Sequence, residues 1–392
     1  MNVEKLRRDF EILKKGIIYF DNSATSLKPK QVLDKQNEFY LEYNANVHRG
    51  VHSLSVRASE EYENAHRKVA RFINAKPEQV AFVKNATEAL NMISNVVKKG
   101  DKAVTTDIEH HSNIVPYLEK KRQGARLDFI KVSKKGEVDF DQIKDVCKGV
   151  KLVSITHVSN VLGNIMPVNE IGKIARDAGA LFAVDAAQSV PHMAVDVKKI
   201  NCDFLALAGH KMLGPMGTGA LYVKNTDALE PLMLGGGTIK EVSLDGYSLG
   251  VSPDRFEAGT PNIAGTIGLG AAVIYLEKIG MNEIEKHEKE LTKKMFDFIQ
   301  SEKAINYYGP TDLKNKAAVF AFNVKGLEPH DAASLLDQKK IMVRSGHHCA
   351  MPVMKKLGVS GTARASLYLY NTKEEIDRFI DAMKHIIKTF SR

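Results

Sequence analysis

Short apolar runs and helical patterns alternate along the chain between about residues 77 and 225. We expect strands at residues 79–84, 102–106, 125–132, 151–157, 181–185, 204–208 and 219–223, with helices such as 87–97 and 168–178 between them. Parallel neighbouring strands need crossover connections, and helices usually supply them. The alternation therefore predicts an α/β fold, in which helices cover both faces of a mainly parallel sheet.

The alternation of short strands and helices ends at about residue 280, where a long charged amphipathic helix is expected. The pattern in this part of the chain predicts helices at 281–302, 329–338 and 373–390 and strands at 317–324, 341–344 and 364–369. Two further helices are expected at 53–73 and 265–279, flanking the alternating block. We therefore expect a smaller α+β domain at the C-terminus, with a boundary that falls within residues 265–290.

Composition argues against several classes of protein. Of the 392 residues, 44% are hydrophobic and 26% are charged, as in ordinary soluble globular proteins. The net charge of +9 is spread over short pairs such as Lys14–Lys15, which disfavours nucleic acid as a partner. No run approaches the roughly 18 apolar residues of a membrane span, and residues 1–20 lack the apolar core of a signal peptide. We expect a soluble protein without a membrane partner.

Only three cysteines occur: Cys147, Cys202 and Cys349. An odd and sparse set gives no disulfide framework, and it contains no CxxC pair of the kind that binds zinc. Such a chain fits the reducing cytoplasm, where we expect the protein to reside.

Two polar residues follow apolar strands at the expected sheet edge. Asp185 ends one strand, at the edge where parallel sheets usually meet ligands, although capping of a helix explains a lone Asp equally well. Lys211 follows the next strand in the sequence Gly-His-Lys and precedes a glycine-rich run that ends at Gly219. In a polar cleft, a lysine with a lowered pKa suits Schiff-base chemistry.

The residues Asn85, Ala86 and Thr87 link an expected strand to a helix. The helix N-terminus and the Thr87 hydroxyl can together hold a phosphate group. Simple capping of the helix by Asn85 or Thr87 is the alternative explanation.

Two histidine pairs, 110–111 and 347–348, stand out. Neighbouring residues of a strand point to opposite faces, so neither pair alone makes a metal site, and zinc bound by distant His and Cys residues is a minor alternative. Cys349 follows the second pair and lies near Arg344, a positive setting that favours the thiolate. Cys147 and Cys202 are expected to be inert core residues.

Several ordered motifs resemble those of one family. They are YFDNSAT at 19–25, NVHRG at 46–50, EHHSNIVP at 109–116, HVSNVLG at 157–163, RFEAGTPN at 255–262 and RSGHHCA at 344–350. Through them the chain resembles, over nearly its whole length, the cysteine desulfurases of the class V aminotransferase superfamily. The short interval between Cys349 and Arg364 is similar to that of the subgroup of Suf-type desulfurases and selenocysteine lyases.

The resemblance implies a pyridoxal-phosphate-dependent transferase of fold type I. Residues 16–270 would form the large, mainly parallel-sheet domain that binds the cofactor. Residues 1–15 and 271–392 would form the smaller α+β domain, which carries the catalytic cysteine. The resemblance further implies a homodimer with active sites at the interface, L-cysteine as substrate, and a sulfur-acceptor protein of the iron–sulfur assembly machinery as partner.

The resemblance also assigns cofactor contacts to matching positions. Lys211 would bind pyridoxal 5'-phosphate covalently and act as general base, Asp185 would pair with the pyridine nitrogen, and His110 would stack on the ring and assist catalysis. Gln188 and Asn160 would contact the ring hydroxyl and the substrate side of the cofactor. The phosphate would be held by Thr87, His210, the backbone near Ala86, and Thr260 from the other subunit.

Substrate contacts follow in the same way. Arg364 would bind the substrate carboxylate as a bidentate fork, and Cys349 would accept the sulfur. Asn160, Ala24 and Arg344 would also lie on the substrate side. The resemblance implies no metal.

One position departs from the family. Relatives usually carry Ser or Thr before Gly-His-Lys, whereas this chain has Ala208. The missing hydroxyl would remove one hydrogen bond to the phosphate, worth about 0.5–1.5 kcal/mol. We expect weaker cofactor retention without loss of catalysis.

These residues predict a cysteine desulfurase that converts L-cysteine to L-alanine and forms a persulfide on Cys349, for iron–sulfur cluster or other thio-cofactor synthesis. A selenocysteine lyase or cysteine sulfinate desulfinase is the nearer alternative. A non-catalytic binding protein on the same fold is the more distant one.

Overall fold

The computed structural model describes residues 1–390 and contains a central seven-stranded sheet. Its strands lie in the order β2 (Val80–Val83), β8 (Gly219–Val223), β7 (Phe204–Ala208), β6 (Leu181–Asp185), β5 (Leu152–Thr156), β3 (Lys102–Thr106) and β4 (Arg126–Ile130). Neighbouring strands are parallel except at β8, which runs antiparallel to β7 and to β2. The prediction of a mainly parallel sheet is confirmed.

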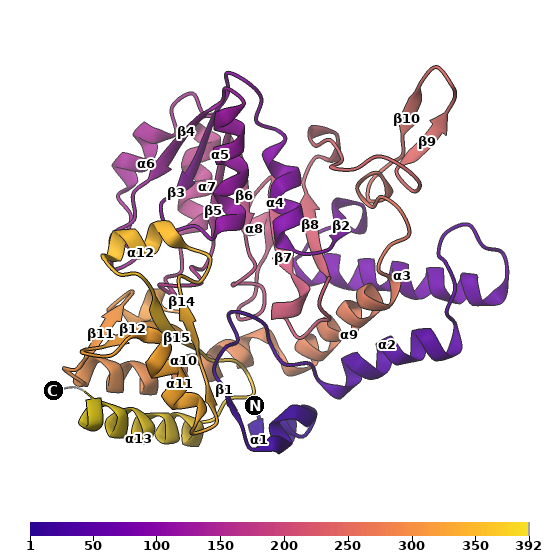
Figure 1. Cartoon of the computed structure of the whole chain (residues 1–392). Helices are drawn as coiled ribbons and strands as arrows, with labels where there is room; N and C mark the ends of the chain where they lie inside the picture. Colours follow the sequence, from indigo (N-terminus) through magenta and orange to yellow (C-terminus); the bar gives the residue numbers. More distant parts are fainter. Residues whose placement is uncertain (391–392) are drawn as a thin grey trace.

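The central strands are buried on both faces. Every residue of β5, β7 and β8 is buried, as is typical of a sheet covered by helices on each side. Figure 1 shows helices α4 (Ala86–Ser94), α5 (Val115–Arg122), α6 (Phe140–Val146) and α7 (Val168–Asp177) along these strands. Each helix follows a strand in the sequence, so the carboxyl ends of the parallel strands lie at one edge of the sheet.

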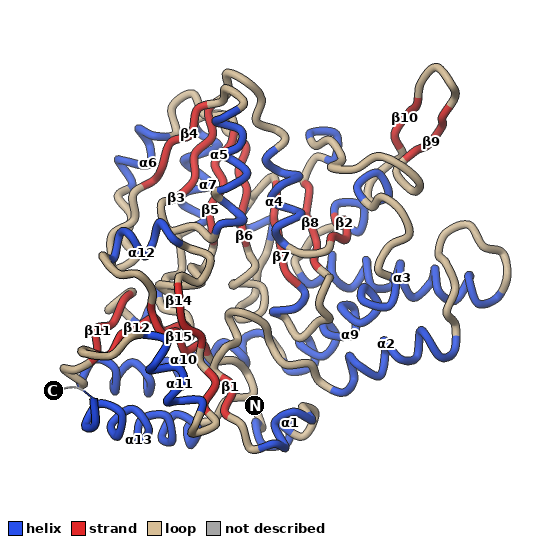
Figure 2. Tube along the Cα trace, in the orientation of Figure 1, coloured by secondary structure: helices blue, strands red, loops and turns tan. Residues whose placement is uncertain are grey.

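Three longer helices pack beside the sheet (Figure 2). They are α2 (Lys30–Glu42), α3 (Ser53–Phe72) and α9 (Ile263–Ile279), and α9 contacts both of the others. At Gly270 of α9 an added Cβ would lie 3.1 Å from the Ala65 backbone of α3. Glycine at this position therefore permits the close approach of the two helices.

A second sheet of four antiparallel strands forms the C-terminal part. Its order is β11 (Ile305–Tyr308), β12 (Val319–Val324), β15 (Thr362–Ser366) and β14 (Arg344–Gly346). Helices α10 (Met281–Ser301), α11 (Pro329–Asp337), α12 (Met351–Leu357) and α13 (Lys373–Phe390) accompany it. The expected α+β character of this region is confirmed.

One expected strand, at residues 341–344, is wrong as a single element. Residues Ile341–Met342 form β13, which pairs in parallel with β1 (Ile18–Tyr19), while β14 begins at Arg344 and pairs with β15. The break arises because the N-terminal segment supplies the hydrogen-bonding partner up to Met342 and β15 supplies it from Arg344 onward.

The N-terminal residues contribute to both parts of the molecule. Leu6, Phe10 and Leu13 pack in the large cluster that contains α2, α3 and α9 residues, whereas Ile18 and Phe20 belong to the C-terminal cluster. The division into domains at 16–270 and at 1–15 with 271–392 stays a prediction.

A hairpin of β9 (Ile239–Val242) and β10 (Tyr247–Leu249) projects from the body of the chain (Figure 1). Its apolar side chains Val242, Leu244 and Tyr247 are exposed.

Within residues 1–390 no single helix is long and apolar enough to cross a membrane. Helices α9 and α10 together reach the required length and apolar composition, but they are bent by 74° relative to each other.

Candidate active site

A cavity of about 500 Å³ opens at the edge where the parallel strands end. Side chains of both sheets line it, and they include every predicted site residue except Thr260. The lining residues among the predicted set are Ala24, Ala86, Thr87, His110, Asn160, Asp185, Gln188, His210, Lys211, Arg344, Cys349 and Arg364. Topology accounts for the residues of the large sheet, because parallel strands bring their carboxyl ends to one edge. Ala24, Arg344, Cys349 and Arg364 come from the N-terminal segment and the C-terminal part.

One end of the cavity is built to hold an anion. Ala86 and Thr87 form the first turn of α4, whose early N–H groups lack helical partners, and the Asn85 side chain accepts only from the Glu88 N–H at 3.0 Å. The Thr87 hydroxyl lies 2.7 Å from the hydroxyl of Ser112. Asn85 therefore caps the helix, and the Thr87 hydroxyl stays a predicted phosphate contact. Sequence reasoning gave Ser112 no role, although it stands two residues after His110.

Asp185 and Lys211 both line the cavity, and each affects the pKa of the other. Asp185 is the last residue of β6, is buried, and accepts a hydrogen bond from the Ala187 N–H at 3.0 Å. Burial raises the pKa of Asp185. Burial lowers the pKa of Lys211 to about 8, although the negative charge of Asp185 acts to raise it. Lys211 is therefore a lysine whose amine is partly unprotonated near neutral pH.

The histidines near this pair are uncharged. Burial lowers the pKa of His110 to about 3 and that of His210 to about 4, and the charge of Lys211 acts in the same direction on both. The Ser112 N–H donates to Nδ1 of His110 at 3.1 Å, so the ring proton of His110 resides on Nε2. His110 and His111 lie at a 3₁₀ turn after β3 and not on a strand, which corrects the expected arrangement of that pair.

Arg364 is buried in β15 and is held at two of its three nitrogens. Nη1 donates to the Asn160 carbonyl at 3.0 Å and Nη2 lies 3.2 Å from the Asp21 carboxylate. Nε of Arg364 is buried without a hydrogen-bond partner among residues 1–390. Burial lowers the pKa of Arg364 to about 10, so the group stays charged at neutral pH.

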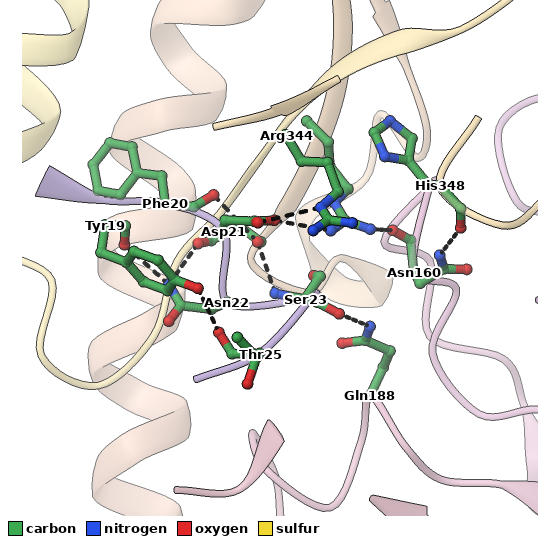
Figure 3. Close-up of polar contacts among 12 residues, drawn as sticks. Tyr19, Phe20, Asp21, Asn22, Ser23, Thr25, Asn160, Gln188, Arg344 and His348 are labelled. Carbon is green, nitrogen blue, oxygen red and sulfur yellow. Dashed lines mark hydrogen bonds and ion pairs between the residues drawn. The ribbon is translucent and has the colours of Figure 1, made fainter. Parts of the chain in front are cut away.

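Asp21 connects Arg364 to the second arginine of the cavity. Its other oxygen lies 3.2 Å from Nε of Arg344, and Figure 3 shows this contact. Asp21 belongs to the motif YFDNSAT at residues 19–25, but the sequence predicted no function for it. No local signal could reveal the role, because the partners of Asp21 lie in the C-terminal sheet.

Cys349 is exposed and belongs to a tightly held loop. His348 and Cys349 adopt left-handed backbone angles, with φ of 52° and 53°. The Asn160 amide donates to the His348 carbonyl at 2.8 Å (Figure 3), and the His111 N–H donates to the Cys349 carbonyl at 2.7 Å. Neighbouring structure thus fixes a conformation that non-glycine residues seldom adopt.

The source of positive charge near Cys349 differs in part from the expectation. Burial lowers the pKa of His348 to about 3, so this histidine is neutral at pH 7. The charge comes instead from the arginines Arg344 and Arg364, which line the same cavity. Cys147 and Cys202 are buried in the core, as predicted, and burial raises the pKa of their thiols to about 11 and about 12.

Two further side chains shape the cavity wall. Gln188 donates to the Ser23 carbonyl at 2.8 Å, as Figure 3 shows, and its buried Oε1 has no partner among the described residues. Ala208, at the end of β7, is buried and lines the cavity without a polar group. The residue therefore offers no hydrogen bond there, as its identity predicts.

Thr260 is not brought to this cavity by its own chain. It is exposed and lines a separate hollow of about 310 Å³ with Glu257 and Pro261. Its assignment to the site of the other subunit stays a prediction. In the described part of the chain, no three His, Cys, Asp or Glu side chains converge as metal ligands.

The lining of the main cavity fits pyridoxal phosphate. Helix α4 and two hydroxyls match a phosphate, a buried carboxylate matches a protonated ring nitrogen, and the unpartnered Oε1 of Gln188 is available to the ring hydroxyl. Lys211, with its lowered pKa, supplies the amine that an aldehyde requires.

Comparison with known proteins agrees with this geometry. The family described as aminotransferase class-V matches residues 18–379. A probable cysteine desulfurase of Pyrococcus abyssi is 50% identical over 394 residues, which cover 98% of each chain. Two solved structures are similar: an apo cysteine desulfurase of Thermococcus onnurineus NA1 (TM-score 0.96, 50% identity, 98% of each chain) and the cysteine desulfurase CsdA of Escherichia coli (TM-score 0.92, 32% identity, 100% of this chain and 99% of that one). The chain therefore belongs to the aminotransferase class-V family, as one of its cysteine desulfurases.

Proposed function

We propose that this cysteine desulfurase uses pyridoxal phosphate to convert L-cysteine to L-alanine, and that it collects the sulfur as a persulfide on Cys349. One observation carries the proposal. The thiol of Cys349, the amine of Lys211 and the guanidinium of Arg364 line a single cavity of about 500 Å³.

The cofactor would be held by residues of the large sheet. When bound, pyridoxal phosphate supplies an electron sink for the bonds at Cα of the substrate. Asp185 would pair with the ring nitrogen, and His110 with its neutral ring would stack on the cofactor. Lys211 would make the covalent link. The phosphate contacts would come from Ala86, Thr87, Ser112, His210 and Thr260 of a second subunit.

The chain's own residues would then act on cysteine in a fixed order. Arg364 would bind the substrate carboxylate through its free Nε and an Nη, because a guanidinium matches a carboxylate with two hydrogen bonds. Lys211 would remove the Cα proton as general base, since its pKa of about 8 leaves a usable fraction of free amine. The Cys349 thiolate would attack the substrate sulfur: the S–S bond forms and the Cβ–S bond breaks, which leaves the persulfide on Cys349. Cβ would then take up a proton, and Lys211 would return a proton to Cα to give alanine.

We further propose a homodimer. Large apolar side chains are exposed on the C-terminal end of α2, on the loop that follows it and on the β9–β10 hairpin, and they include Leu41, Val51 and Leu244. Exposed apolar surface favours association with another protein surface. A second copy fits because Thr260 lies outside its own chain's cavity.

The sulfur would leave by transfer to a thiol of an iron–sulfur assembly protein in the cytoplasm. Cys349 is exposed, but the hydrogen bonds of its loop leave it little freedom to move outward. The acceptor thiol would therefore have to enter the cavity mouth.

The test compares wild-type protein with Cys349→Ser and Lys211→Ala, all supplied with pyridoxal phosphate. Alanine and sulfide release from L-cysteine with dithiothreitol is measured together with the visible spectrum. We expect equimolar products from the wild type, and no sulfide from Cys349→Ser despite normal cofactor uptake. Full activity in Cys349→Ser would refute the persulfide step, whereas activity only on selenocysteine or cysteine sulfinate would favour the alternative substrates.

A further inference from the structure

We propose that Glu109 is a positioning residue of the cofactor site, whose buried carboxyl closes the turn that presents His110 and Ser112 to the cavity. The proposal rests on the cofactor site argued above. Glu109 itself is fully buried and does not line the cavity, so it acts through the residues that do.

The carboxyl of Glu109 ties together the two ends of that turn. Its Oε2 accepts a hydrogen bond from the Asn113 amide at 2.7 Å. Residues 109 and 113 bracket both His110 and Ser112, which line the cavity. One hydrogen bond therefore closes the loop on which both residues stand.

The other oxygen fastens this closed turn to the sheet. Oε1 lies 2.6 Å from the Thr106 hydroxyl at the end of β3 and accepts from the Thr156 N–H at the end of β5, at 3.0 Å. Asn113 adds a further anchor, because its Oδ1 accepts from the Ser154 hydroxyl of β5 at 2.7 Å. The turn is thus fixed to two adjacent strands, one of which also supplies Thr156 to the cavity wall.

This anchoring fixes the positions of His110 and Ser112, which are residues of the proposed cofactor site. Ser112 donates from its N–H to His110 Nδ1 at 3.1 Å, and its hydroxyl lies 2.7 Å from that of Thr87. A shift of the turn would therefore move the imidazole and the hydroxyl pair together. We infer that loss of the Glu109 carboxyl weakens the hold on the cofactor at two points.

The carboxyl is buried without a cationic partner among residues 1–390, and such burial favours its uncharged form. All three of its hydrogen-bonding neighbours are neutral, and no Lys, Arg or His side chain bonds to it within residues 1–390. The ionisable groups that act on it or feel its charge are Asp185 on β6 and the phenol of Tyr117 on α5. Burial, with Asp185 adding to it, raises the pKa of Glu109 to about 8. The Thr106 hydroxyl, the Thr156 N–H and the Asn113 amide all donate to the carboxyl, and these bonds oppose the effect of burial on its pKa.

The experiment compares Glu109→Gln, Glu109→Ala and Asn113→Ala with wild type and with Glu170→Gln, an exposed residue of α7. Apoprotein of each is titrated with pyridoxal phosphate, and the visible absorbance gives the dissociation constant. The pH midpoint of the bound cofactor's absorbance and the thermal unfolding midpoint of the apoprotein are also measured. None of these measurements requires turnover.

Glu109→Gln should behave like wild type within about twofold. A flipped Asn113 amide restores the bond across the turn, the Ser154 hydroxyl can accept from that amide instead of donating to it, and no charge is lost. Glu109→Ala should raise the dissociation constant about tenfold or more, which corresponds to the loss of one or two hydrogen bonds. If its apoprotein does not fold, Asn113→Ala, which removes the bond across the turn and the bond from Ser154 but keeps the Glu109 carboxyl, should raise the constant several-fold.

An unchanged constant in Glu109→Ala, or in a folded Asn113→Ala, would overturn the positioning role. A pH midpoint that moves by about half a unit or more in Glu109→Gln would show an ionised Glu109 and overturn the neutral carboxyl. Failure of the wild-type apoprotein itself to bind pyridoxal phosphate would instead refute the proposed function.

Discussion

Replacement of Arg364 by Lys tests the substrate-binding geometry most directly. The guanidinium is fixed by the Asn160 carbonyl on Nη1 and by Asp21 on Nη2. In the proposed site, the substrate carboxylate would therefore use the buried, unpartnered Nε and share one Nη. Lysine keeps the positive charge, but it places one nitrogen where arginine places three. The change therefore separates the loss of hydrogen bonds from the loss of charge.

The expected magnitude follows from the bonds that lysine cannot make. Arg364→Lys removes at least one charge-assisted hydrogen bond to the substrate, worth about 1.5–3 kcal/mol. This lowers kcat/KM by roughly 10- to 150-fold, since each 1.36 kcal/mol is a factor of ten. The carboxylate is bound both before and during the reaction, so the loss should appear mainly as a higher KM.

The assay is alanine release from L-cysteine over a range of concentrations, with Arg122→Lys as a control on the exposed surface of α5. Cofactor uptake and the thermal midpoint are checked for each variant, because Arg364 also bonds to Asn160. If Arg364→Lys folds, takes up the cofactor and keeps kcat/KM within about threefold of wild type, the bidentate assignment of Arg364 is wrong.

Three further outcomes are expected. Ala208→Ser should tighten pyridoxal phosphate binding about 2- to 13-fold, equivalent to one hydrogen bond of about 0.5–1.5 kcal/mol, as measured by titration of the apoprotein; weaker binding would contradict it. The rate at which apoprotein takes up the cofactor should rise with pH and level off above about 8, because the lowered pKa of Lys211 sets the fraction of free amine. A pH-independent rate would contradict the assignment of Lys211 as the residue that binds the cofactor. Asp185→Asn should retain the cofactor but lower turnover about 10- to 150-fold, because an amide does not stabilise a protonated ring nitrogen. Steady-state kinetics measures this loss, and an unaffected kcat would contradict the role of Asp185.

The sequence predicted the central sheet well for a physical reason. Strands such as β5 and β7 are buried on both faces, so each appears in the sequence as a short apolar run between helical segments. The same regularity located Asp185 and Lys211, because polar residues that follow such runs must emerge at one sheet edge. The strand expected at 341–344 was wrong because its hydrogen-bonding partner changes partway along it, and the pairing depends on β1, which is distant in sequence.

The parts of the site that sequence reasoning missed depend on tertiary contacts. Asp21 acquires its function only when the fold brings it to Arg344 and Arg364. His348 looks like a source of positive charge beside Cys349, yet burial leaves it neutral at pH 7. A residue's type can be read from the sequence, but its protonation depends on burial and on neighbours that the local sequence does not contain.

The charges around the cavity show why Asp21 belongs to the site. Two arginines, Arg344 and Arg364, would give a doubly positive wall in the absence of a carboxylate. Asp21 lies 3.2 Å from each and leaves one positive charge in excess. That excess matches the single carboxylate of an amino-acid substrate. A buried arginine is also costly unless it is paired, so Asp21 stabilises Arg364 before substrate arrives and leaves its Nε free to bind. If Arg364 binds the substrate carboxylate as proposed, selectivity for an amino acid would depend on incomplete neutralisation of the arginine pair.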